Sequence, residues 1–139
     1  MTRYDSCYLN IISFVTKNIE QQKQFQKILQ ELEEQIPKVS KETTRALYIY
    51  RGKYRVCLNS DNLDDENLLA LEAEWDKNHQ KMKTLEQIHK ILKENQNESG
   101  FFDIEAIDRK LMSYAILATQ KELYNVAKIF SSYREKLIK

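Results

Sequence analysis

The sequence predicts an all-α protein, an antiparallel bundle of four to five helices in a single domain covering residues 1–139. The chain has only two glycines and one proline in 139 residues, so it has few of the residues that make tight turns. It is rich in Gln, Glu, Lys and Leu, which favour helices. Its apolar residues also recur in steps of three and four over long stretches, which is the period of an amphipathic helix.

The first predicted helical stretch runs from Tyr4 to Ile36. Its apolar stripe thins near residues 16–18, so the stretch is either one long helix or two helices joined there. Pro37 disfavours helical geometry at the residue before it, and we expect the helix to end at Ile36.

Residues 40–59 allow two interpretations. Apolar residues alternate with polar ones on both sides of Arg51-Gly52, which predicts a short β-hairpin there. The same segment also carries a helical stripe, made of Leu47, Tyr50, Tyr54 and Leu58. A lone two-stranded hairpin is only marginally stable, whereas a glycine inside a helix costs up to ~1 kcal/mol relative to alanine. Helix and hairpin therefore both stay open.

A second long helix is predicted from about Asp64 to Asn95. The acidic segment before it favours the positive end of a helix dipole and supplies capping side chains. Such a helix would be ~45 Å long. Its stripe steps by three and four throughout: Leu68, Leu71, Trp75, Asn78, Met82, Leu85, His89 and Leu92.

The last segment begins at Asp103, a natural N-cap. Two apolar stripes overlap between Leu111 and Ala118, which predicts a helix buried on most sides in the middle of the bundle. The sequence from Thr119 to Glu122 fits a capping box, so we expect a bend or break there.

No motif indicates catalysis or a bound cofactor, and we predict that the protein is not an enzyme. The Glu86–His89 pair has the spacing of di-iron ligands, but its one companion, Asp76–His79, lies on the same helix ~15 Å away. His89 is therefore expected to be a core histidine. Cys7 and Cys57 show no metal-binding spacing, and we expect reduced, buried thiols in a cytoplasmic protein.

The near-neutral total charge hides five blocks of alternating sign. Residues 1–60 carry net +4, residues 61–76 net −7, residues 77–93 net +4, residues 94–108 net −5 and residues 109–139 net +5. Oppositely charged blocks on neighbouring helices favour specific pairing, within the chain or with a partner. Surplus apolar residues could add a contact patch: Ile12, Phe101 and Phe102. No run approaches the ~20 apolar residues of a membrane span, so we expect no membrane partner.

The segment from residue 38 to residue 55 combines cations with tyrosines. Lys and Arg neutralise phosphates, and tyrosine rings stack on unpaired bases. The alternative is that the tyrosines belong to the core and the cations form its solvated edge. The candidate nucleic-acid-binding residues are Lys38, Lys41, Arg45, Tyr48, Tyr50, Arg51, Lys53, Tyr54 and Arg55.

These observations predict a non-catalytic helical interaction subunit, an adaptor or a small structural subunit that joins a protein partner or a larger complex. The alternative is a subunit that binds a nucleic-acid backbone through residues 38–55. In size and helical character the chain is similar to the small helical subunits of CRISPR effector complexes, and equally to phage-encoded protein inhibitors. The resemblance rests on no signature residues of these families.

Overall fold

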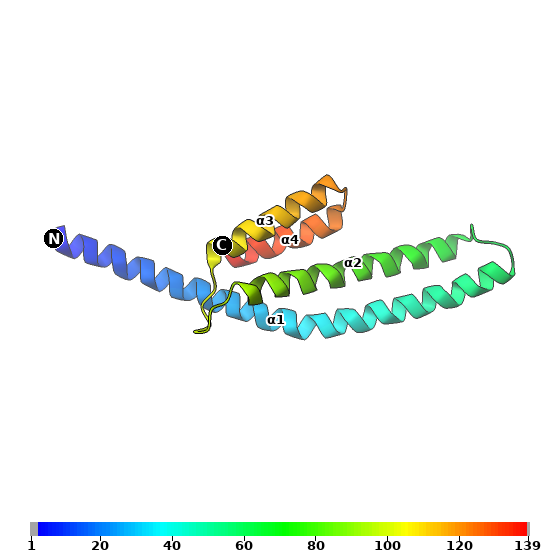
Figure 1. Ribbon diagram of the computed structural model, residues 1–139, viewed down its shortest axis with the longest axis horizontal. Helices are drawn as coiled ribbons and strands as arrows, with labels where there is room; N and C mark the ends of the chain where they lie inside the picture. Colours follow the sequence, from blue (N-terminus) through cyan, green and yellow to red (C-terminus); the bar gives the residue numbers. More distant parts are fainter. Residues whose placement is uncertain (1–2, 139) are drawn as a thin grey trace.

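The computed structural model describes the backbone of residues 3–138 and the side chains of residues 18–138. It is all-helical, as the sequence predicts, and no strand occurs within the described residues. An isolated antiparallel bridge joins Gln96 to Phe102 in the link between the second and third helices. The four helices (Figure 1) are α1 (Arg3–Asn59), α2 (Glu66–Glu94), α3 (Ile104–Gln120) and α4 (Tyr124–Ile138).

Helix α1 is far longer than predicted, because it continues through both of its expected interruptions. The expected end at Ile36 is wrong: Pro37 lies inside α1. Proline has no backbone N–H, so one carbonyl of the helix lacks its hydrogen-bond donor. Ile36 and Val39, on either side of Pro37, pack into the core and keep this segment helical. The β-hairpin alternative around Arg51-Gly52 is also wrong. That segment is helical, and its buried side faces α2 along its length.

The helices form two antiparallel hairpins of unequal length. Helices α1 and α2 make a long hairpin, and α3 and α4 make a short one that packs against one end of it (Figure 1). We call the packed end the base, residues 22–36 and 82–138. The rest of the long hairpin, residues 38–80, projects from the base as two helices, and we call it the arm.

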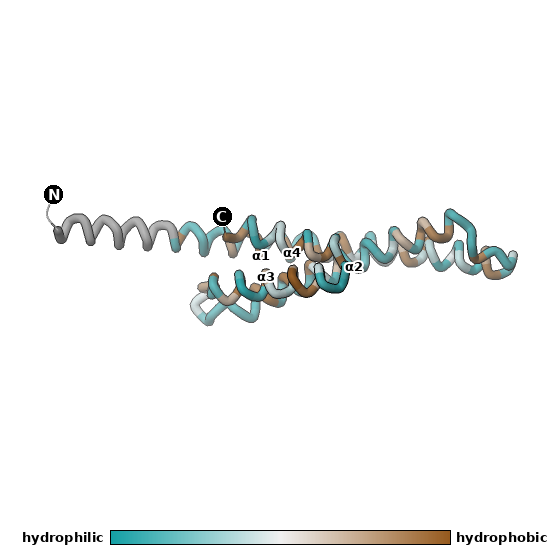
Figure 2. Tube along the Cα trace, turned by 90° about the horizontal axis from the view of Figure 1, so that it is seen from above, coloured by the Kyte–Doolittle hydropathy of each residue, from teal (hydrophilic) through white to brown (hydrophobic). Residues whose placement is uncertain are grey.

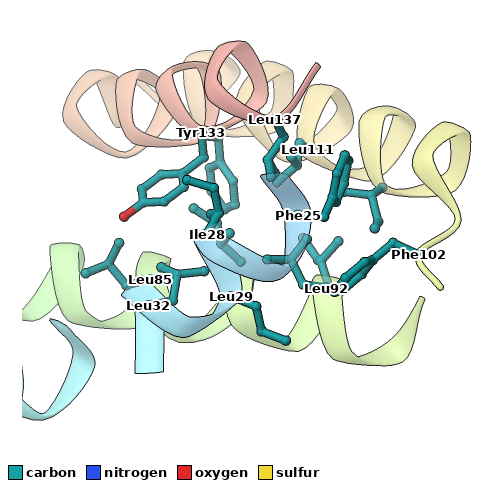
Figure 3. Packing of buried hydrophobic residues seen from close by; sticks show 14 of the residues in the cluster. Phe25, Ile28, Leu29, Leu32, Leu85, Leu92, Phe102, Leu111, Tyr133 and Leu137 are labelled. Atoms are coloured by element: carbon teal, nitrogen blue, oxygen red, sulfur yellow. The ribbon is translucent and has the colours of Figure 1, made fainter. Parts of the chain in front are cut away.

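The main hydrophobic core lies in the base, where all four helices contribute side chains (Figure 3). Phe25 of α1 packs against Phe102, with ring centroids 5.5 Å apart. The Tyr133 hydroxyl donates a hydrogen bond to Gln35 at 3.2 Å across the base. The side chains that are most completely buried are Phe25, Leu32, Leu85, Ile88, Ile91, Leu92, Ile107, Leu111 and Leu137.

Helix α3 is not central to the bundle, contrary to the sequence prediction. Met112 is 45% exposed and Ile116 is 51% exposed. Only one of the two overlapping stripes is covered, because α4 and the long hairpin lie on the same side of α3. The part of the second stripe that lies on α3 therefore faces solvent.

Both helical hairpins turn through residues with left-handed backbone geometry. At the end of α1, Asp61 has φ 54°, and at the end of α3, Glu122 has φ 62°. Each lies in a Schellman motif: the amide of the next residue bonds back to Cys57 in the first turn and to Ala118 in the second. The predicted break near Thr119 is present, but its hydroxyl donates to the Ala115 carbonyl and does not cap α4.

The predicted caps of the two middle helices are present. The Asp65 carboxylate accepts from the first amides of α2, and the Asp103 carboxylate accepts from the Ala106 amide of α3. Hydrophilic and hydrophobic residues are interspersed along the coloured parts of the four helices (Figure 2). Among the described residues no helix has an apolar stretch sufficient to span a bilayer.

Candidate interaction surface on the arm

A ladder of aromatic rings holds the two helices of the arm together. Tyr50 of α1 stacks on Trp75 of α2 with centroids 6.3 Å apart and planes within 9° of parallel. Trp75 stacks in turn on His79 at 5.3 Å, and Tyr54 extends the ladder on the other side at 6.2 Å from Tyr50. Such pairs add about 0.5–1.5 kcal/mol each beyond the area they bury. The ladder therefore adds to the aliphatic contacts of the arm, such as the buried Leu68, where only two helices meet.

Tyr50 is half-buried in this ladder. Burial, the Glu72 carboxylate and Tyr54 together raise the pKa of its hydroxyl. Tyr54 is 39% exposed and Tyr48 is 68% exposed, so the interpretation of the tyrosines as core residues does not hold for Tyr48.

The predicted cations and Tyr48 largely share one face of α1. This face is directed away from α2, because its residues are exposed and step by three and four around the helix. We call it the basic stripe: Lys38, Lys41, Arg45, Tyr48, Gly52 and Arg55. The helical rise makes it ~25 Å long.

The other predicted site residues lie elsewhere on α1. Lys53 turns toward α2, where its ammonium lies 3.8 Å from the Asp65 carboxylate. Arg51 is exposed on a flank of the helix, on the same side as Tyr54. Sequence proximity had therefore grouped side chains that helical geometry separates.

Among the side chains of residues 18–138, no ion pair includes a cation of the basic stripe. The acidic residues of the arm lie mainly on α2 and in the turn before it. The arm therefore has one basic helix and one acidic helix, a distribution that attracts anionic groups to the α1 edge.

A shallow open depression of about 600 Å³ lies against the upper part of the basic stripe. Its lining comes from consecutive turns of α1: Ser40, Lys41, Thr44, Arg45, Tyr48 and Ile49. Its lining combines cationic side chains with apolar ones, which is the composition of a contact surface.

Two exposed apolar residues beside the stripe were not predicted as site residues. Ile49 is 47% exposed and Val56 is 59% exposed. A Cβ added to Gly52, between them, would meet nothing within 4 Å. A helical periodicity applied to residues 45–56 would have found all three, but the competing hairpin pattern assigned Ile49 and Val56 to strands.

The other candidates from the sequence are His89, a possible metal site and the apolar contact patch. His89 is half-buried and pairs with Glu33 at 3.2 Å. Within residues 18–138 no three His, Cys, Asp or Glu side chains gather as metal ligands. Phe102 is buried and does not belong to the expected contact patch, whereas Phe101 is 56% exposed.

Both cysteines were expected to be buried, and Ile12 was expected to belong to the contact patch. Cys57 is buried, as expected, on the side of α1 that faces α2. Cys7 and Ile12 lie outside the residues whose side chains are described.

Comparison with known proteins adds no assignment: no family model, no curated protein and no solved structure matches this chain. The fold and the arm define a helical protein with a projecting two-helix extension. This extension is therefore the candidate functional part of the protein.

Proposed function

We propose that the protein is a non-catalytic interaction subunit of a larger assembly, and that the arm is its partner-binding element. The observation that carries the proposal is the basic stripe, whose cations have no counter-charge among the described side chains and whose centre, Tyr48, is 68% exposed. A folded chain gains little from keeping a long helix clear of its own core. A binding function gives that projection a use.

The composition of the arm surface supports contact with a macromolecule. Large exposed aromatic and arginine side chains are the residue types that most often dominate binding energy. Tyr48 lies between Arg45 and Arg55 on one face, with Ile49 and Val56 beside it. The rigid helix also presents them with little loss of backbone freedom on binding.

Site-specific photo-crosslinking tests this proposal. A photoreactive amino acid is placed at Tyr48 in the stripe and, as a matched control, at Ser132, which is exposed on α4 in the base. In the native lysate we expect a specific adduct from position 48 and none from position 132. Absence of an adduct at position 48, or the same adducts from both positions, would contradict an arm-centred binding function.

Charge reversal separates specific binding from general attraction. The Lys41/Arg45/Arg55→Glu variant should lose the adduct. The Arg109/Lys121/Lys128→Glu variant makes the same change in net charge on exposed residues of the base and should keep it. Equal loss in both variants would show that only bulk charge matters.

A second candidate is binding of a nucleic-acid strand along the basic stripe, favoured by its four aligned cations and an exposed tyrosine ring. Each base stacked on such a ring contributes about 1–3 kcal/mol. The acidic α2 would repel phosphates and confine the strand to the α1 edge. In an assembly, the stripe would then line part of a nucleic-acid channel.

Fluorescence anisotropy with labelled single strands tests this candidate. If each of the four cations contacts a phosphate, the logarithm of the binding constant should fall with the logarithm of the salt concentration with a slope of about −3. Tyr48→Leu should weaken binding by about 1–3 kcal/mol, whereas Tyr50→Leu should have no direct effect, since Tyr50 stacks within the arm. No binding by the wild type at low salt would end intrinsic nucleic-acid binding.

A further inference from the structure

We propose that two copies of this chain pair through one broad side of their arms, as a symmetric dimer in which α1 of each copy lies on α2 of the other. This goes beyond the proposed function and does not rest on it, because it uses a different surface. The surface, which we call the dimer face, consists of Arg51, Tyr54, Leu58, Leu69, Glu72 and Asp76.

The position of the dimer face follows from the groove on the opposite side of the arm. There, a shallow groove of about 270 Å³ runs between Ala46 and Ile49 of α1 and Leu71 and Glu74 of α2. Helical spacing puts Arg51, Tyr54 and Leu58 on the other flank of α1, and Leu69, Glu72 and Asp76 on the matching flank of α2. Neither α3 nor α4 extends over the arm (Figure 1), so they leave this side uncovered.

The dimer face is more apolar than a solvated helix surface needs to be. Leu58 is 52% exposed, Leu69 is 53% exposed and Tyr54 is 39% exposed. All three lie toward the tip of the arm, Tyr54 and Leu58 on α1 and Leu69 on α2. Exposed apolar side chains gathered in one region mark interaction sites.

The charges of the dimer face identify the occupant as a second copy. Arg51 lies on one helix and the two carboxylates, Glu72 and Asp76, lie on the other. Tyr50 stacks on Trp75, and the Thr43 hydroxyl donates to the Asn78 carbonyl, so Arg51 is level with residues 70–74 of the antiparallel α2, beside Glu72. A two-fold axis along the arm keeps these levels and exchanges the helices.

The same symmetry also matches the apolar groups. Leu58 of one copy comes level with residues 63–67 of the other, within ~3–9 Å along the axis of Leu69. Arg51 of each copy then faces Glu72 and Asp76 of the other, so every charge pair occurs twice. The face is complementary to itself under this rotation, as an isologous interface requires.

The proposed dimer leaves the basic stripe free. The stripe faces away from α2, whereas the dimer face lies on a broad side of the arm. The assembled arms would form a four-helix unit, which buries more apolar surface than a two-helix arm can bury alone.

Charge exchange across the interface tests the dimer. Arg51→Glu places carboxylates against Glu72 and Asp76 in its homodimer, and Glu72/Asp76→Arg places cations against Arg51. In sedimentation velocity the wild type should be a dimer, and each variant alone should dissociate with at least a tenfold higher Kd. An equal mixture of the two variants should form a 1:1 heterodimer, since all its pairs are again opposite in sign.

Controls keep the test specific to this face. Arg45→Glu makes the same charge change on the basic stripe and should remain dimeric, while Leu58→Ser should weaken the dimer at any salt concentration. Circular dichroism and the fluorescence of Trp75, the single tryptophan, report that each variant has a folded arm.

Two results would overturn the dimer. The first is a wild type that stays monomeric at about 100 µM, where a specific micromolar dimer is largely formed. The second is a variant mixture that gives no heterodimer. Because neither result depends on a substitution in the basic stripe, either result leaves the photo-crosslinking from Tyr48 as a separate measurement of the proposed function.

Discussion

The base and the arm are built from the same two long helices, yet they differ in how those helices are held. In the base, α1 and α2 are covered by α3 and α4, and side chains such as Leu32 and Ile88 are fully buried. In the arm, the same helices have only each other, and an aromatic ladder with exposed flanks forms part of their contact. Fully buried apolar side chains are therefore concentrated in the base, whereas the arm is mostly exposed.

The largest expected difference comes from truncating matched leucines in the two regions. Leu92 in the base is fully buried, while Leu71 in the arm is half-buried. Leu92→Ala should lower the free energy of unfolding by about 2–5 kcal/mol. Leu71→Ala should lower it by about 1 kcal/mol, because the site is already partly hydrated. Urea unfolding followed by circular dichroism measures both, and equal losses would contradict the contrast.

An intermediate effect is expected from alkaline pH through Tyr133. Burial and the Glu31 carboxylate raise the pKa of its hydroxyl above the ordinary value of about 10. Between the unfolded and the folded pKa, the unfolded chain has released this proton and the folded chain retains it. The free energy of unfolding therefore falls as pH rises through that window, and the contribution is fully present below it.

Tyr133→Phe isolates this effect. The variant loses the hydrogen bond to Gln35, at a cost of about 0.5–1.5 kcal/mol at neutral pH. Its stability should then decline less steeply than that of the wild type above pH 10. Part of the decline should remain, because the pKa of Tyr50 in the arm is raised as well. An unchanged slope in urea unfolding from neutral to alkaline pH would contradict the assignment.

The smallest effects come from backbone substitutions, and they can be directed to one region at a time. Gly52→Ala fills open space on an exposed helix and should stabilise the arm by up to about 1 kcal/mol. Glu122→Gly relieves a left-handed backbone in the base and should give a similar gain there. Hydrogen exchange should show added protection in the arm for the first and in the base for the second. Added protection in both regions from either change would contradict independent stability.

The sequence predicts the helical class and the stripe of α2 well, because both depend on local periodicity. It fails at Pro37, where α1 continues with Ile36 and Val39 packed into the core, and it leaves helix and hairpin open at Arg51-Gly52, where the segment is helical. It also fails for Met112 and Ile116, since an apolar pattern does not state which of two stripes will be covered.

The candidate site was predicted as a segment and not as a surface. The sequence places cations and tyrosines together between residues 38 and 55. Only the helical geometry separates Tyr48, which faces solvent, from Tyr50, which stacks on Trp75. The dimer face needs α1 and α2 side by side, so no single stretch of the sequence contains it.

Hydrogen exchange measured by mass spectrometry tests the central claim, that a stable base carries a less stable binding arm. It is performed on the Arg51→Glu variant, so that pairing of arms does not add protection. Amides of residues 40–57 and 68–80 should exchange at least about tenfold faster than those of residues 25–36 and 85–92, through local opening that leaves the base intact. Uniform protection along α1 and α2, lost only in global unfolding, would contradict the account.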